Sequence, residues 1–320
     1  GGLGGLGLKV AEWLGKQGAG HLVLMGRAGD VSFEQRTVVS ALATKGTRVT
    51  IAKGDVANRA QMEQILADIQ GSGMPLRGIV HAAGCLDDGV IMQQTPLRFR
   101  TVMGPKVQGA WHLHELTRKQ PLDFFVLYAS AAGLLGSPGQ ANYAAANTFL
   151  DALAHYRRAL GRPALSIDWG AFSEVGLAAA QDNRGARLAS RGMHSLTPDQ
   201  GMEALGRLLA AGLVQIGVAP IDIQQWAASH HAAAVSRRLS RLQREQQGEP
   251  RREQAAQELL VRLLAAKPQA RASMLVEILL TQVAQVLHLP ENQIPMTAPL
   301  TALGMDSLMG LELRNRIESV

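Results

Sequence analysis

The stretch "GGLGGLGLKVAEWLGKQGAGHLVLMGR" (residues 1–27) decides the fold. Gly2, Gly4 and Gly7 match G-x-G-x-x-G, apolar residues then recur at helical spacing, and "HLVLMG" reads as a buried strand. A glycine run alone is a weak signal, because linkers are also glycine-rich. A glycine-rich turn before a helix and a strand is typical of a nucleotide-binding fold, since it lets backbone N–H groups approach a pyrophosphate. The strand that should precede the turn is absent, so we expect a Rossmann-like sheet truncated at its first strand.

Arg27 stands at the end of the expected strand 21–26. An NAD site usually has an acidic residue here for the ribose 2′-hydroxyl, whereas a guanidinium can pair with a 2′-phosphate. A plain surface arginine is the simpler interpretation. The position nevertheless favours NADP(H).

Strand and helix patterns alternate along the rest of the first two thirds of the chain. Further expected strands are "TRVTIAKGDV", "LRGIVHAAG", "LDFFVLYAS", "ALSIDWG" and "LVQIGVAPI". Thr95 before Pro96 predicts a capped helix start. The alternation predicts an α/β fold with a doubly wound parallel sheet, whose ligands lie at the carboxyl ends of the strands. The candidate site residues at those ends are Asp55, Ala83, Gly84, Ser130 and Trp169.

Tyr143 and Asn147 are neighbours on one helix face, shortly after Ser130. A phenol, with a pKa near ~10, becomes a useful proton donor near neutrality only if a cation lowers that value. Lys106 on the preceding helix is the candidate cation. In carbonyl reduction Ser130 would hold the carbonyl oxygen, Tyr143 would protonate it, and Lys106 would tune Tyr143 and hold a ribose. Asn147 could anchor a water that resupplies the proton; each residue alone could equally be structural.

Several of these motifs resemble one family. The stretches "GGLGGLG", "GDVA", "HAAG", "YASAAGLLGSPGQANYAAAN" and "SIDWGAF" are similar to the ketoreductase domain of type I polyketide synthases, a branch of the short-chain dehydrogenase/reductases. The resemblance covers residues 1–222. Most of the superfamily has Tyr-x-x-x-Lys, whereas here Asn147 follows Tyr143 and the lysine is at 106, as in the polyketide and fatty acid synthase branch.

The resemblance implies a catalytic set and a cofactor site. The catalytic set is Lys106, Ser130, Tyr143 and Asn147. The residues expected to contact NADPH are Gly2, Gly4, Gly7, Arg27, Asp55, Val56, Ala83 and Gly84, with Trp169 and Gly170 near the nicotinamide.

The resemblance also bears on stereochemistry. Leu86, Asp87 and Asp88 form the LDD stretch that marks B-type reductases, which give the D-configured β-hydroxyl; Pro138 and Asn142 fit the same type. Leu135 replaces the tryptophan of A-type domains, and Ala146 the proline linked to epimerising B-type members. An ordinary turn would also explain the two aspartates.

The C-terminal part resembles another family. Gly304-Met305-Asp306-Ser307-Leu308 is similar to the acyl carrier protein motif, in which the serine carries 4′-phosphopantetheine. The match covers residues 273–320 and implies a partial all-α carrier domain with Ser307 as the attachment site. A serine at a helix start could also be simply a cap.

The net charge is +6, which invites a nucleic-acid interpretation. The basic excess is densest in residues 236–271, which hold nine Lys/Arg and four Asp/Glu, within an expected linker 223–272. No aromatic residues are interleaved there, so a solvated linker is favoured over a nucleic-acid site. Cys85 is the single cysteine, no metal-ligand pattern is present, and no apolar run is expected to span a membrane. These features suit a cytoplasmic protein.

The sequence therefore predicts an NADPH-dependent reductase that converts a carrier-bound β-ketoacyl thioester to a β-hydroxyacyl thioester. We expect it to act with an acyl carrier protein domain and the other domains of a multidomain synthase that is dimeric at full length. Two alternatives stay open. One is an inactive reductase-like scaffold, and the other is the equivalent domain of a fatty acid synthase.

Overall fold

The computed structural model describes residues 1–29, 31–177, 184–229, 261–287 and 289–318. They fall into two compact units: Gly1–Ala189 with Met193–Pro220, and Ser190–Gly192 with Ile221–Val320. Each unit is described by itself.

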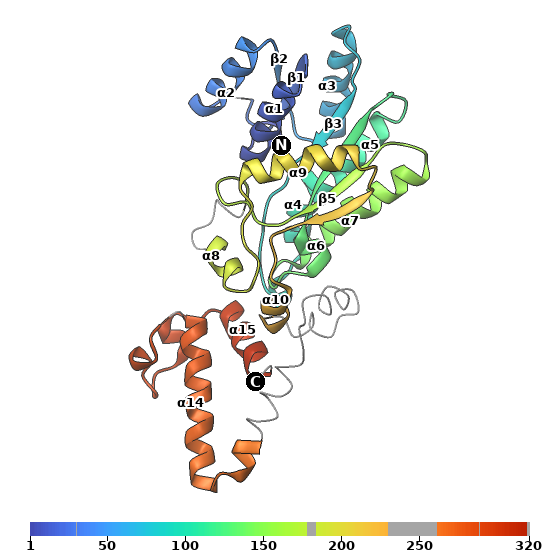
Figure 1. Ribbon diagram of the computed structural model, residues 1–320. Coiled ribbons are helices and arrows are strands. Elements are labelled where there is room, and N and C mark those ends of the chain that lie inside the picture. Colours follow the sequence, from blue (N-terminus) through green and yellow to red (C-terminus); the bar gives the residue numbers. More distant parts are fainter. Residues whose placement is uncertain (30, 178–183, 230–260, 288, 319–320) are drawn as a thin grey trace. The chain divides into compact units, whose positions relative to one another are not determined.

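The first unit alternates helices and strands, as the sequence predicts (Figure 1). Its first half contains α1 (Gly5–Lys16), β1 (His21–Gly26), α2 (Phe33–Thr44), β2 (Arg48–Lys53), α3 (Arg59–Gly71) and β3 (Gly78–His81). Its second half contains η1 (Ile91–Gln93), α4 (Pro96–Met103), the π-helical turn η2 (Gly104–Gln108), α5 (Gly109–Leu116), β4 (Phe124–Ser130), α6 (Ala131–Leu135), α7 (Ala141–Ala159), β5 (Leu165–Trp169), α8 (Arg184–Ala189), α9 (Pro198–Ala210) and β6 (Gln215–Val218).

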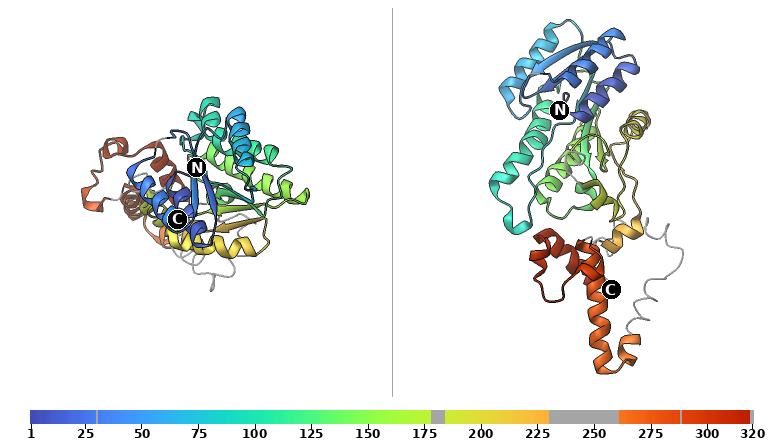
Figure 2. Two further views of the ribbon diagram at one scale, coloured as in Figure 1. Left: turned by 90° about the horizontal axis from the view of Figure 1, so that it is seen from above. Right: turned by 90° about the vertical axis from the view of Figure 1, so that its left-hand side faces the viewer.

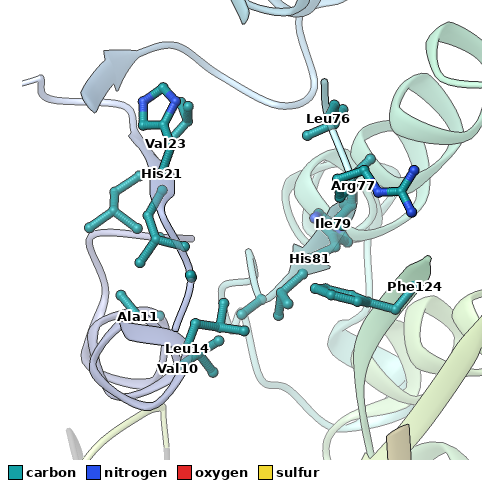
Figure 3. Close-up of a pocket in the computed structure, with 18 of the residues that line it drawn as sticks. Val10, Ala11, Leu14, His21, Val23, Leu76, Arg77, Ile79, His81 and Phe124 are labelled. Atoms are coloured by element: carbon teal, nitrogen blue, oxygen red, sulfur yellow. The ribbon is translucent and has the colours of Figure 1, made fainter. Parts of the chain in front are cut away.

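All strand pairs are parallel, but the sheet is in two pieces: β1 pairs with β2, and β3, β4, β5 and β6 pair in that order. A cavity of about 1250 Å³ lies between the pieces. Figure 3 shows Val10 and Leu14 of α1 and Val23 of β1 on one side, and Ile79 of β3 and Phe124 of β4 on the other. Gly1, Gly2 and Gly7 of the glycine-rich turn line this cavity.

Helices cover both faces of the sheet (Figures 1 and 2). The central strand β4 explains why, because alternate side chains on a strand point to opposite faces. Phe125 and Leu127 belong to the core under α3, α5 and α7, whereas Val126 and Tyr128 belong to the core under α1 and α9. A strand that is apolar on both faces needs cover on both, which is the doubly wound arrangement.

Local signals in the sequence explain two helix starts. The Thr95 side chain accepts a hydrogen bond from the Arg98 N–H (3.3 Å), and Pro96 is the first residue of α4, which confirms that prediction. Helix α2 was not expected from the sequence, although Ser32 and Gln35 form a reciprocal capping box at its start. The π-helical turn η2 between α4 and α5 was not expected either.

The second unit is helical in its described residues, as expected for a carrier domain. It contains α10 (Ile223–Ser229), α14 (Pro268–Leu287), the short helices η3 (Glu291–Gln293) and η4 (Leu300–Leu303), and α15 (Ser307–Glu318). Ser307 is the first residue of α15, and the cap is Asp306, whose Oδ1 accepts from the Met309 N–H at 2.7 Å. Most of the expected basic linker, residues 230–260, lies outside the described residues.

The sequence analysis expects no apolar run that could span a membrane, but one described helix meets the criteria of length and composition. Within the described part of the chain, the window Ala270–Leu287 of α14 is long and apolar enough to cross a membrane by length and composition. A core helix of a soluble domain passes the same test, so the observation is weak. Ala284, Val286 and Leu287 of this helix are already buried within the protein.

Candidate active site

Lys106 and Tyr143 meet at the carboxyl end of the central strands. The Lys106 Nζ lies 5.3 Å from the centre of the Tyr143 ring, and donates a hydrogen bond to the Tyr128 carbonyl of β4 at 2.9 Å. The lysine is 3 % exposed. Burial lowers the pKa of Lys106 to about 8, although the nearby Asp151 carboxyl opposes this change.

Asn147 completes the face that Tyr143 begins on α7. It is fully buried, and its Nδ2 donates to the Tyr143 carbonyl at 2.7 Å. Its Oδ1 is buried and has no hydrogen-bond partner among the described residues. An unpaired buried oxygen is costly, so this atom is suited to accept from a bound water or ligand.

Ser130 is the last residue of β4 and caps the short helix α6. Its Oγ accepts a hydrogen bond from the Ala132 N–H at 3.2 Å. The following helix α7 packs against both α6 and β4. The strand β4, which Ser130 ends, and the helix α7, which carries Tyr143, are thus neighbours in the fold.

The glycine-rich turn fits a dinucleotide phosphate. A Cβ on Gly7 would stand 2.1 Å from the Gly1 carbonyl oxygen, and one on Gly2 would stand 2.9 Å from the Met25 nitrogen. Only glycine allows this tight turn into α1. The N-cap residue Gly4 provides no side-chain hydrogen bond, so no side chain caps the first N–H groups of α1. Such a helix start can bind an anionic group.

The other expected cofactor contacts lie at strand ends and differ in how exposed their side chains are. Arg27 is exposed just after β1. Asp55, after β2, accepts from the Ala57 N–H at 2.9 Å and shapes the turn there. Val56 is 4 % exposed and packs in the core, so its side chain is not available to a cofactor. A Cβ on Gly84 would be 3.1 Å from Lys106 Cε, so a glycine at 84 leaves room for the lysine.

Trp169, which is expected near the nicotinamide, is a buried residue at the end of β5. Its ring is 3 % exposed and packs in the core, with centroid distances of 5.5 Å to both Tyr128 and Phe172. Gly170 donates its N–H to the Val218 carbonyl of β6 at 2.9 Å. The Trp169 indole thus packs in the core, and the Gly170 backbone pairs with the end of β6.

The LDD loop is held against the turn before α7. The Gln140 Nε2 donates to both Asp88 carboxylate oxygens, at 3.0 and 3.2 Å. Asn142 Nδ2 donates to the Asp87 carbonyl at 2.8 Å, and Arg98 forms an ion pair with the Asp87 carboxylate at 3.6 Å. Leu86 lies half-buried in the same loop. The loop is thus hydrogen-bonded to the start of α7, the helix that carries Tyr143.

Two acidic residues near the site were not expected from the sequence. Asp151 lies on α7 one helical turn beyond Asn147, and Asp168 lies on β5; both are buried. The signals were available, since Tyr143, Asn147 and Asp151 have i, i+4 spacing and "LSIDW" places an acid inside an apolar strand. No cluster of metal-ligating side chains occurs in the part of the chain that the structure describes.

Comparisons with known proteins identify two families along the chain. Residues 1–174 match the KR domain family, and residues 277–320 match the phosphopantetheine attachment site family. The chain is 35 % identical over its full length to a phenolphthiocerol/phthiocerol polyketide synthase protein of Mycobacterium tuberculosis, of which it covers 14 %. It is 40 % identical over 99 % of its length to a spectinabilin polyketide synthase protein of Streptomyces orinoci, of which it covers 15 %. The chain thus spans about one seventh of these relatives.

Solved ketoreductases have the same fold. A structure titled as an A1-type ketoreductase has a TM-score of 0.68 at 38 % identity, covering 71 % of this chain and 47 % of that one. The first ketoreductase of the tylosin polyketide synthase has a TM-score of 0.65 at 37 % identity, covering 73 % and 50 %. These memberships imply NADPH for the first domain and 4′-phosphopantetheine for the second. The chain belongs to the ketoreductase domain family of polyketide synthases, and its C-terminal part is a phosphopantetheine-attachment domain.

Proposed function

We propose that this chain catalyses NADPH-dependent reduction of a carrier-bound β-ketoacyl thioester to a β-hydroxyacyl thioester. The placement of a buried lysine ammonium 5.3 Å from the Tyr143 ring carries the proposal. A cation beside a phenol stabilises the phenolate that remains after the proton has left. A purely structural lysine would be expected to extend into solvent, because burial of an ammonium is costly.

The chain's own groups have separate tasks in this reaction. Bound NADPH supplies the hydride. Ser130 Oγ donates a hydrogen bond to the substrate carbonyl oxygen, and the Tyr143 hydroxyl donates the proton to that oxygen. Lys106 stabilises the resulting phenolate. The unpartnered Asn147 Oδ1 holds a water that returns a proton to Tyr143. The N-terminal N–H groups of α1 and the Arg27 guanidinium hold the phosphates.

The substrate is proposed to arrive on the phosphopantetheine arm of Ser307. We assign residues 1–222 to the reductase, 223–272 to a linker and 273–320 to the carrier domain. The protein would act inside a dimeric, cytoplasmic multidomain synthase, with neither nucleic acid nor a membrane as partner. The test for Ser307 is incubation with coenzyme A and a phosphopantetheinyl transferase. Mass spectrometry should show one added phosphopantetheine group, which Ser307→Ala abolishes and Ser273→Ala, in α14, retains.

The proposed product has the D-configured β-hydroxyl. The proposal depends on individual residues, because the overall fold is shared with A-type domains such as the solved A1-type structure. Here the LDD loop is anchored by Gln140 and Asn142 directly before Tyr143. A loop fixed at that point can favour entry of the pantetheine arm from one side of the crevice, which presents one face of the ketone to the hydride.

The decisive experiment follows NADPH oxidation by absorbance with the acetoacetyl thioester of N-acetylcysteamine. Tyr143→Phe should lower kcat at least about 100-fold while NADPH binding, followed by fluorescence, is kept. Tyr156→Phe is the matched control, because Tyr156 lies on the same helix but is 49 % exposed. A parent protein that binds NADPH and reduces no β-ketoacyl thioester would overturn the proposal in favour of a scaffold role.

A further inference from the structure

The strand β5 has an unusual polar face. Leu165, Ile167 and Trp169 pack in the apolar core under α1 and α9. The alternate residues Ser166 and Asp168 are both 0 % exposed and point to the opposite face of the sheet. On the neighbouring strand β4 that face is filled by apolar side chains. Packing alone does not explain a buried hydroxyl and a buried carboxyl in the middle of the sheet.

These groups belong to a hydrogen-bonded cluster with Asp151 of α7. The Ser166 hydroxyl donates to Asp151 Oδ1 at 2.6 Å, and Gln215 Nε2 of β6 donates to Asp168 Oδ2 at 2.9 Å. The Asp151 and Asp168 carboxyl groups hydrogen-bond to each other. Asp168 Oδ1 has no other partner among the described groups.

Two carboxyl groups in hydrogen-bond contact cannot both be ionised, because the like charges repel at short range and burial increases that repulsion. One proton is therefore shared between them, and the pair carries a single negative charge. Burial raises the pKa of Asp168 to about 7 and also raises that of Asp151, in agreement with a retained proton.

Lys106 is a buried cation that acts on both carboxyl groups. Burial lowers the pKa of Lys106, and Asp151 and Asp168 both oppose this change because they favour the charged ammonium. Three other titratable groups face the lysine: the Cys85 thiol, the His81 ring of β3 and Tyr143. Burial lowers the pKa of His81 to about 3, so this ring is neutral. His155 of α7 is exposed and favours the ionised form of Asp151.

We propose that the Asp151–Asp168 carboxyl pair provides the single negative charge that balances the Lys106 ammonium, and thereby keeps the Lys106–Tyr143 couple in its proton-donating state. The pair does not touch the substrate. It acts through Lys106, so both acids are positioning residues for the site. The inference rests on the proposed reduction for its kinetic readout only.

The test uses the double variant Asp151→Asn/Asp168→Asn, with the single variant Asp168→Asn beside it. In the single variant the remaining Asp151 carboxyl group can ionise, so the cluster keeps one negative charge, whereas the double variant keeps the shape and the hydrogen-bond acceptors and removes that charge. Asp151→Ser/Asp168→Asn replaces the double amide if the latter fails to fold. Asp123→Asn is the control, because Asp123 forms a surface ion pair with Arg77. Titration of nitrogen-15-labelled lysine by NMR, with Lys106 assigned through Lys106→Met, reads the Lys106 Nζ directly.

The double variant should move the Lys106 titration to lower pH by about one unit, as removal of one nearby buried negative charge implies, and the single variant should leave it nearly in place. The alkaline limb of kcat/KM for NADPH oxidation should move with it, since that limb reports the first proton lost from the Lys106–Tyr143 couple. The control should change neither. An unchanged Lys106 titration in the double variant would overturn the inference. A shifted titration in a protein that reduces no thioester would uphold the counter-charge and overturn the proposed function instead.

Discussion

The Lys106 ammonium lies against the Tyr143 ring at 5.3 Å although the two residues come from different elements, the π-helical turn η2 and helix α7. The wider π turn is part of the reason, because it changes the direction in which side chains leave the helix between α4 and α5. The lysine therefore points inward, where it also meets the Tyr128 carbonyl. Burial makes this charge sensitive to pH and to its neighbours.

The reduction should lose activity in alkaline solution. Burial lowers the pKa of Lys106 to about 8, so the ammonium is present below that pH and is lost as the pH rises through it. We expect kcat/KM for reduction to be flat in neutral solution and to fall about tenfold per unit at higher pH. A pH series of NADPH oxidation measures this. Lys119→Met, at an exposed position, should keep the profile, and a rate that stays constant well above pH 8 would contradict the assignment.

The stereochemical outcome should depend on Gln140. Its amide fixes the Asp88 carboxylate with two hydrogen bonds, so Gln140→Ala releases one anchor of the LDD loop. We expect the ratio of D to L product to fall at least about tenfold, which corresponds to about 1.4 kcal/mol of lost discrimination. Chiral chromatography of the reduced thioester measures the ratio. Gln93→Ala, at an exposed position of η1, should leave it unchanged; an equal loss there would show that the effect is not specific.

Cofactor preference should depend on Arg27. Arg27→Ala removes the guanidinium that is proposed to pair with the 2′-phosphate, so KM for NADPH should rise roughly 10- to 100-fold. The KM for NADH should change little, because NADH lacks that phosphate. Steady-state kinetics with both cofactors measure the difference. Arg48→Ala is the control, since Arg48 is exposed at the opposite end of β2, and equal losses for NADPH and NADH would contradict the role of Arg27.

Stability should depend on the buried Arg157. Its guanidinium lies 3.7 Å from the centre of the Phe125 ring, and its Nε donates to the Pro163 carbonyl at 3.1 Å. Arg157→Met leaves that carbonyl without its donor and removes the cation–ring contact, so the free energy of unfolding should fall by roughly 2–4 kcal/mol. Chemical denaturation measures the change. The exposed neighbour Arg158→Ala should cost under about 1 kcal/mol, and equal costs would contradict the importance of burial.

Sequence reasoning was most successful where the signal was local. The capped start of α4 at Thr95 depends on two adjacent residues, and the parallel strands depend on short apolar runs. It was less successful where geometry depends on distant partners. The segment Gly104–Gln108 was expected to be ordinary helix but is the π-helical turn η2, and the packing of the Trp169 indole against Tyr128 and Phe172 was not expected. Both features depend on side chains from other elements that pack against these residues.

The sequence by itself determined the alternation of strands and helices, the glycine-rich turn at Gly2, Gly4 and Gly7, and the residue types available for proton transfer. These follow from periodicity and from conformations that few residues can adopt, and both are properties of short segments. Only the tertiary structure decided that Asp151 and Asp168 share a buried site near Lys106. The charge of an ionisable group depends on its solvent exposure and on neighbours from other elements, which exist only when the chain has folded.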